Sequence, residues 1–335
     1  MSIRLYLEEL EEKNLCEFAQ LSKNSRGRSR PEEKCDIRTD FQRDRDRIIY
    51  SKAFRRLKHK TQVFISPEGD HYRTRLTHTL EVSQIGRTIA RSLRLNEDLT
   101  EAIALGHDLG HTPFGHAGER VLDMVCSKGF KHNEQSVRVV SCLEKDRKGL
   151  NLTAEVLEGI LCHTGDLLPH TLEGQVVRFA DKIAYINHDI EDAIRGGILT
   201  ERDIPEDASD VLGKTLSERI NNMIVNIIDN SSDGRAIRMN GEFQEATNRL
   251  RNFMFENVYI GSAAKKEESK AERMIEELYN YLIKNPGTMP EDFQGYVGQE
   301  SVEQAVIDYI AGMTDPYAVK RFKEIFVPVS WFEQG

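Results

Sequence analysis

The chain has 335 residues, of which 39% are hydrophobic and 30% charged, with a net charge of −9. This composition supports a large buried core and excludes disordered, collagen-like and fibrous proteins. Apolar runs fall far short of the roughly 20 residues that cross a bilayer, and the N-terminus lacks the pattern of a signal peptide. We therefore expect a cytoplasmic protein without a membrane partner, whose five cysteines are reduced and mainly buried.

The net charge is distributed unevenly. Between Ser22 and Lys60 the chain carries 14 Lys and Arg residues against six Asp and Glu, a local charge of +8 that leaves −17 on the rest. Such a segment suits phosphate binding, and a solvated basic surface explains it equally well.

Apolar residues recur at three-to-four-residue spacing along most of the chain, which predicts an all-α fold. In chain order, the predicted helices are Arg75–Leu95, Glu97–His107, Thr153–Cys162, Leu172–Ile194, Leu212–Ile228, Ala271–Ile283 and Val302–Ala311. Asn96 and Thr153 are predicted N-caps. One short β-hairpin around Val63–His71 is compatible with the β-branched residues and Pro-Glu-Gly-Asp turn signal there.

No low-complexity linker or repeat divides the chain. The most polar stretches, Ser22–Lys34 and Gly261–Lys270, are predicted to be loops. We expect a single compact helical domain with extensions at both ends.

Eight of the ten histidines lie within 111 residues, most densely in ALGHDLGHTPFGHAGE at 104–119. Neighbours on a regular helix point about 100° apart, so His107 and Asp108 can share one ion only near a helix end. Gly106, Gly110 and Pro113 supply the backbone irregularity that this requires.

Two more residues complete a candidate metal site. His78 lies one turn after Arg75 on the same helical face, and Asp181 lies in an otherwise apolar helix, where a carboxylate is costly unless it is paired or bound to metal. Two His and two Asp suit Mn, Fe, Co, Ni or Zn, and also Mg when water and substrate phosphates complete an octahedron. Taken singly, each of these residues is more often structural.

The combination resembles a known family. His78, the pair His107-Asp108 and Asp181 match the H…HD…D pattern of the HD-domain metallophosphohydrolase superfamily. The flanking strings resemble the bacterial dGTP triphosphohydrolase family, in its shorter dGTPase-like branch, in order over about residues 43–318: RRLKHKTQVF, DHYRTRLTHTLEVSQIGRTIAR, GHDLGHTPFGHAGE, HNEQS, RFADKIAYINHDIEDA and DYIAGMTDPYA.

The resemblance implies an all-α HD-domain fold with a catalytic core at 60–195 and helical extensions at 1–59 and 196–335. It implies water attack at the α-phosphate of a dNTP, yielding deoxynucleoside and inorganic triphosphate. The four ligands named above would hold a divalent metal, with Mn or Mg expected first. His116 and Glu119 would be the acid/base histidine and its acidic partner, and His132 a second histidine near the 5′ oxygen.

The helix after residue 178 is an independent check on this assignment. Asp181, Tyr185 and Asp189 follow at i, i+4 and i+8, so all three line one cleft if Asp181 faces the metal. By resemblance, Asp189 and Gln62 would bind the 3′-OH, and Tyr185 would lie against phosphates and ribose. If Asp181 does not bind a metal, Tyr185 is expected to be a core residue, and Asp189 a charged helix residue three positions before Asp192.

Lys182 and Arg75 are the expected triphosphate contacts. Other basic residues are open to phosphates, a neighbouring subunit or single-stranded nucleic acid: Arg55, Arg56, Lys58 and Lys60. Pro316 stands where the family often has a basic residue, which argues against a phosphate contact there. The resemblance also implies a homo-oligomer, hexamer or tetramer, and activation by a second nucleotide.

Two other functions are kept as alternatives. One is a different HD-domain nucleotide phosphohydrolase, such as a nucleotidase or a (p)ppGpp hydrolase. The sequences GHTPFGH and HDIEDA argue against this alternative. The other is a non-catalytic regulator that binds dNTP or single-stranded nucleic acid, against which the complete ligand and acid/base set speaks.

Overall fold

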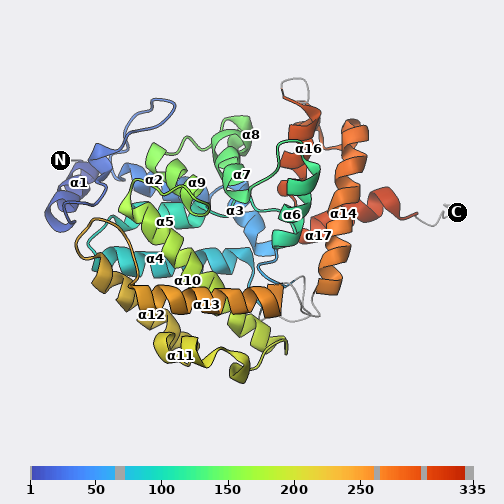
Figure 1. Cartoon of the computed structure of the whole chain (residues 1–335). Helices are drawn as coiled ribbons and strands as arrows, with labels where there is room; N and C mark the ends of the chain where they lie inside the picture. Colours follow the sequence, from blue (N-terminus) through green and yellow to red (C-terminus); the bar gives the residue numbers. More distant parts are fainter. Residues whose placement is uncertain (1, 65–71, 260–264, 296–299, 329–335) are drawn as a thin grey trace, which may run out of the picture.

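The computed structural model describes residues 2–64, 72–259, 265–295 and 300–328 (Figure 1). Over these residues the chain forms helices without a β-strand, plus two isolated bridges, Arg28–Thr153 and Thr61–Thr74. The all-α prediction is confirmed, whereas most of the predicted hairpin at Val63–His71 lies outside the described residues. None of the helices in these ranges combines the length and the apolar character needed to cross a membrane.

The first α-helices, in chain order, are α1 (Ile3–Asn14), α2 (Asp40–Ile49), α3 (Lys52–Arg56), α4 (Arg75–Ser92), α5 (Glu97–Gly106), α6 (Gly115–Val125), α7 (His132–Arg138), α8 (Glu144–Arg147), α9 (Ala154–Cys162) and α10 (Leu172–Arg195). The later ones are α11 (Glu206–Leu212), α12 (Leu216–Ser231), α13 (Gly241–Met254), α14 (Lys265–Lys284), α15 (Glu291–Gln294), α16 (Val302–Ala311) and α17 (Asp315–Phe326). Two π-helical turns occur, at Val139–Leu143 and Phe255–Tyr259, and short 3₁₀ turns at Ser22–Asn24, Leu57–His59, Glu201–Asp203 and Pro286–Thr288.

Helix α10 runs through the centre of the larger hydrophobic core and packs against α4, α5, α9 and α12. Its buried apolar residues follow the helical period, as Val176, Ala180 and Ile183 illustrate. A second buried cluster is built from α6, α14, α16 and α17, on the right of Figure 1. Leu109 belongs to the first cluster and Phe114 to the second, so the stretch between α5 and α6 joins the two.

Local signals predicted several helix boundaries closely, but the predicted helix Leu212–Ile228 is wrong, because α11 ends at Leu212 and α12 spans Leu216–Ser231. Asn96 caps α5 as predicted, accepting a hydrogen bond from the Leu99 amide at 3.2 Å. Thr153 occupies the N-cap position of α9 as predicted, although its hydroxyl donates to Asp44 and makes no capping hydrogen bond. The predicted loop at 261–270 is wrong from Lys265 onward, because α14 begins there. Only two of the cysteines are buried, Cys126 and Cys162.

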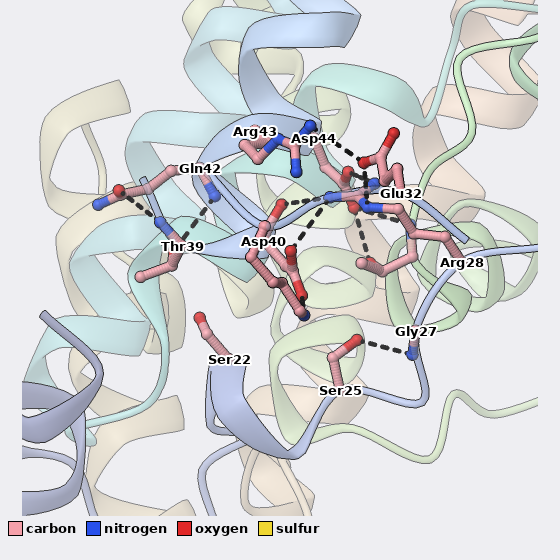
Figure 2. Close-up of polar contacts among 12 residues, drawn as sticks. Ser22, Ser25, Gly27, Arg28, Glu32, Thr39, Asp40, Gln42, Arg43 and Asp44 are labelled. Carbon is pink, nitrogen blue, oxygen red and sulfur yellow. Dashed lines mark hydrogen bonds and ion pairs between the residues drawn. The ribbon is translucent and has the colours of Figure 1, made fainter. Parts of the chain in front are cut away.

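The basic N-terminal segment is held by internal ion pairs (Figure 2). Arg28, with a side chain only 5% exposed, pairs with the fully buried Asp44, and its Nε lies 2.9 Å from Glu32. Arg43 and Arg47 reach the same Glu32 carboxylate at 3.2 and 2.8 Å. Part of the local positive charge is therefore paired with carboxylates of the same segment.

Candidate metal centre

The His107-Asp108 pair lies where α5 ends, as the sequence predicted. The helix stops at Gly106, and His107 follows as its C-cap. The turn is then anchored to α7, because Gly110 N donates to Ser136 Oγ at 2.9 Å and Ser136 Oγ donates to the His107 carbonyl at 2.7 Å. Gly110 has no room for a side chain, since a Cβ there would lie 2.2 Å from Ser136 N.

The four predicted ligands converge from three helices. His78 of α4 places Nε2 3.1 Å from Asp181 Oδ1 of α10. His107 Nε2 lies 3.9 Å from that same Asp181 oxygen and 3.5 Å from Asp108 Oδ2. His78, His107 and Asp108 are buried, and the Asp181 side chain is 20% exposed. His78, His107 and Asp108 lie close enough together to hold one ion, and so do His107 and Asp181 with His163.

The protonation of this set fits a divalent ion. The Ala104 carbonyl, 2.7 Å away, can only accept, so His107 Nδ1 donates to it and Nε2 is the nitrogen left to face a cation. That buried nitrogen has no hydrogen-bond partner among the described residues. A buried acceptor that faces two carboxylates is costly unless a cation lies between them.

Both carboxylates are ionised at neutral pH. Burial raises the pKa of Asp181, but the hydrogen bond from His78 and the charge of His107 outweigh it and lower that pKa to about 2. For Asp108, burial is likewise outweighed, chiefly by the Arg75 guanidinium, and the pKa lies well below its usual range. The centre therefore presents negative oxygens to a cation.

Arg75, one of the expected triphosphate contacts, forms an ion pair within the site. Its Nη1 lies 2.6 Å from Asp108 Oδ2, and both side chains are buried. Its Nε and Nη2 have no hydrogen-bond partner in the described part of the chain. Arg75 thus fixes the carboxylate of Asp108 and retains free donors.

A second group of histidines adjoins this centre. Glu119 accepts hydrogen bonds from both the Nδ1 and the backbone N of His132, each at 2.8 Å. Its other oxygen lies 3.3 Å from Nδ1 of His116, whose side chain is 69% exposed. His132 Nε2 lies 4.0 Å from Asp108 Oδ1, so the predicted acid/base residues do lie beside the predicted ligands.

The His132–Glu119 pair favours the charged forms. Burial lowers the pKa of His132, but the hydrogen bond to Glu119 and its charge outweigh burial and raise that pKa. The pKa of Glu119 is far below its usual range, because the hydrogen bonds from His116 and His132 overcome its burial. Glu119 therefore favours the protonated form of His132, whose side chain is partly buried.

Sequence reasoning missed two histidines of this group. His163 Nε2 lies 3.1 Å from His132 Nε2, and burial lowers the pKa of His163 to about 3. The ring of His111 stacks on His132 with centroids 4.8 Å apart. His111 stood in the GHDLGHTPFGH string and His163 in the histidine-rich region, but neither spacing alone pointed to the site.

The sugar-side residues lie further along α10. Asp189 is buried, and burial raises its pKa to about 6. It accepts a 2.5 Å hydrogen bond from the hydroxyl of Tyr259, which sequence reasoning missed because the two are 70 residues apart. Tyr185 is partly buried, and burial raises its pKa to about 12. Asp192, the alternative neighbour of Asp189, pairs with Arg73 at 2.9 Å.

The remaining predicted contacts are dispersed. Lys182 Nζ reaches Asn248 Oδ1 at 3.2 Å, and burial lowers the pKa of Lys182. Gln62 Oε1 is buried without a hydrogen-bond partner in the described ranges. These two side chains keep polar atoms for a ligand.

Comparison with known proteins agrees with this geometry. The HD domain family matches residues 75–186, and the phosphohydrolase-associated domain family matches residues 237–324. A deoxyguanosinetriphosphate triphosphohydrolase-like protein from Caldanaerobacter subterraneus is 62% identical over 100% of this chain and 99% of the relative. Proteins of the same name from Clostridium tetani and Geobacter sulfurreducens are 50% and 41% identical, over 98% and 95% of this chain and 97% of each relative.

The fold has counterparts among solved structures. A phosphohydrolase from Bacteroides thetaiotaomicron aligns with a TM-score of 0.51 at 16% identity, over 83% of this chain and 68% of that one. With near-complete coverage by relatives and an HD-domain match over the His/Asp cluster, the chain belongs to the deoxyguanosinetriphosphate triphosphohydrolase-like family of HD-domain phosphohydrolases and is a hydrolase.

Proposed function

We propose that the protein is a metal-dependent dNTP triphosphohydrolase that converts dGTP, and other dNTPs, to deoxynucleoside and inorganic triphosphate. The observation that carries the proposal is the placement of His132, held through Nδ1 by Glu119, with Nε2 4.0 Å from the Asp108 carboxylate of the His/Asp cluster. A proton donor beside a cation site suits phosphate-ester hydrolysis. The names of the relatives support dGTP as substrate.

We assign the metal to His78, His107, Asp108 and Asp181, with Mn or Mg as the first candidates and Fe, Co, Ni or Zn as alternatives. When bound, a divalent ion supplies Lewis-acid polarisation of the α-phosphate and lowers the pKa of a water molecule. Arg75 keeps Asp108 ionised and oriented, and its free donors face incoming phosphate oxygens.

The proton for the departing 5′ oxygen comes from the histidines that share Glu119. Glu119 accepts from Nδ1 of His132, which leaves Nε2 as the nitrogen that exchanges the proton with the substrate. His116 is mostly exposed and touches the other oxygen of Glu119, so it can exchange protons with solvent. Glu119 orients both rings, and the pair acts as general acid and base.

The sugar lies on the α10 side of the cleft in this proposal. Asp189 accepts a hydrogen bond from the 3′-OH together with Gln62, and Tyr259 orients Asp189. Tyr185 lies against the ribose and rejects a 2′-OH by crowding. Lys182 contributes a cation to the triphosphate.

Further parts of the proposal rest on the resemblance. Residues 60–195 form the catalytic core, and the extension at 196–335 contributes Tyr259. The protein acts in the cytoplasm as a homo-oligomer, hexamer or tetramer. A second nucleotide activates it, and the exposed basic residues of the N-terminal segment are open to single-stranded nucleic acid.

The test is incubation of each dNTP with Mn²⁺ or Mg²⁺, followed by chromatography of the products. Intact triphosphate and deoxynucleoside are expected. Release of pyrophosphate or orthophosphate would instead favour another HD-domain nucleotide phosphohydrolase. Asp108→Ala should abolish turnover, whereas Asp229→Ala, an exposed carboxylate of α12, should not. Wild-type turnover by Asp108→Ala would contradict the metal assignment.

A further inference from the structure

The C-terminal string DYIAGMTDPYA, residues 308–318, takes no part in the chemistry proposed above. It forms the end of α16 and the start of α17, within the region that matches the phosphohydrolase-associated domain family. Its side chains nevertheless reach two segments of the active site, which lie about 200 and 250 residues earlier in the chain.

Asp315 connects these two segments. Its side chain is buried at the first turn of α17. One carboxylate oxygen, Oδ1, accepts a hydrogen bond from Phe114 N at 2.9 Å. The other, Oδ2, accepts from Thr61 N at 2.9 Å and from Thr61 Oγ1. A single carboxylate therefore holds the residue that precedes Gln62 and a residue two positions before His116.

Lys60 makes a parallel connection. Its buried Nζ donates to the His111 carbonyl and, at 2.7 Å, to the Ala311 carbonyl. Its own carbonyl accepts from Arg75 N at 3.1 Å, at the start of the helix that carries His78. The turn between α16 and α17 is thus bound to both ends of the loop at 111–116.

The loop needs such support because its backbone is unusual. Phe114 has φ of 60° and Gly115 φ of 57°, two consecutive left-handed residues immediately before His116. Phenylalanine rarely adopts this conformation unless its surroundings hold it. Gly115 lies against the neighbouring segment so closely that a Cβ would be 3.2 Å from the Gln62 carbonyl oxygen.

We propose that Asp315 is a positioning residue for the catalytic site. It holds the left-handed loop that carries His116 and the segment that carries Gln62 in one arrangement, so the C-terminal helices set the geometry of a site to which they contribute no reacting group. This role rests on the proposed function only in its kinetic consequence. The bonds from Asp315 to Phe114 and Thr61 exist whatever the substrate is.

The first test is Asp315→Asn, which keeps the shape but replaces one acceptor oxygen with a donor. That donor must face either Phe114 N–H or Thr61 N–H, so one of the two connections is lost. The matched control is Thr314→Ala, because Thr314 caps the same helix through Tyr317 N without contacting the loop. For Asp315→Asn we expect kcat to fall about 10- to 100-fold, with a smaller change in KM.

A second readout is independent of turnover. Amide hydrogen exchange of residues 111–116 and of Thr61 should become faster in Asp315→Asn and stay unchanged in Thr314→Ala. Thr61→Ser, which keeps the hydroxyl donor, should retain more activity than Thr61→Val. Unchanged exchange and kcat in Asp315→Asn, or an equal loss of kcat in Thr314→Ala, would overturn the proposal. If the wild type releases no triphosphate, the proposed function fails, and the exchange data still decide the positioning role.

Discussion

Replacing Asp189 with Asn should stabilise the metal-free protein while impairing the enzyme. Asp189 is buried, and burial raises its pKa from 3.8 to about 6. At neutral pH the folded protein must keep this carboxylate charged in a site that favours its neutral form. A shift of about two pKa units corresponds to about 3 kcal/mol of lost stability.

The sign of the pH dependence follows from the direction of the shift. The folded protein holds the Asp189 proton more tightly than the unfolded chain, so the unfolding free energy of the wild type falls as pH rises from about 4 to about 6. Asp189→Asn lacks this titration. Its advantage should be smallest below pH 4 and reach a plateau above pH 6, at about 2 kcal/mol after about 1 kcal/mol is allowed for a weaker hydrogen bond with Tyr259.

The assay is thermal or urea denaturation of both proteins in EDTA at several pH values between 4 and 8. A net gain of about 2 kcal/mol corresponds to a rise in Tm of about 3 °C for a chain of this length. Tyr259→Phe is the companion variant, because loss of its hydrogen bond should extend the destabilisation of the wild-type carboxylate to higher pH.

Activity should change in the opposite direction. Loss of the charged acceptor for the 3′-OH should lower kcat/KM about 10- to 100-fold, which corresponds to a charged hydrogen bond of about 1.5–3 kcal/mol. A stability difference between Asp189→Asn and wild type that does not vary with pH would refute the reasoning about burial. Unchanged kcat/KM would remove Asp189 from the sugar site.

Three further outcomes are expected. Arg28→Met should destabilise the protein by about 3–5 kcal/mol without raising KM, because it leaves Asp44 buried and unpaired. Arg38→Ala should cost about 1 kcal/mol or less, because it breaks only an exposed ion pair. Denaturation measures the stability of both variants, and steady-state kinetics measures their KM. Gly110→Ala should lower Tm sharply, since its Cβ would lie 2.2 Å from the Ser136 backbone nitrogen, at a cost of about 3 kcal/mol or more. Saturating Mn²⁺ should raise Tm, because the ion binds the folded protein. Thermal denaturation at a Mn²⁺ concentration of about 100 times Kd should show about 2.7 kcal/mol of stabilisation. A variant that lacks a metal ligand should lose this stabilisation.

Several helices, such as α5 and α16, were predictable because their signals are local, whereas α6, α7, α13 and α17 were not among the predicted helices. Helix α10 spans Leu172–Arg195, one residue longer than its apolar period predicted. The break after α5 was predictable for the same reason, since Gly106 and Gly110 act on the backbone around them. The two α10 carboxylates, Asp181 and Asp189, follow from helical spacing once the helix is known.

The misses concern partners that are distant in the chain. A charge count could not distinguish solvated arginines from Arg28, which pairs with Asp44 beside the start of α9. The hydrogen bond from Tyr259 to Asp189 could not be predicted from the residues around Asp189, because Tyr259 lies 70 residues later, in a π-helical turn. His163 reached the site in the same way, through the end of α9.

The sequence by itself determined the helical character of the fold and the helix end at His107-Asp108, because both depend on spacing and steric preference within a few residues. The candidate ligands were identified by their resemblance to the H…HD…D pattern, since His78 and Asp181 lie 103 residues apart. Tertiary structure decided which groups face one another: the His132 ring against Glu119, Arg75 against Asp108, and Asp315 against the loop at Phe114. These pairings depend on how two hydrophobic clusters close around residues 107–116. Protonation and orientation in a buried site are set by neighbours in space, and the order of residues along the chain does not specify them.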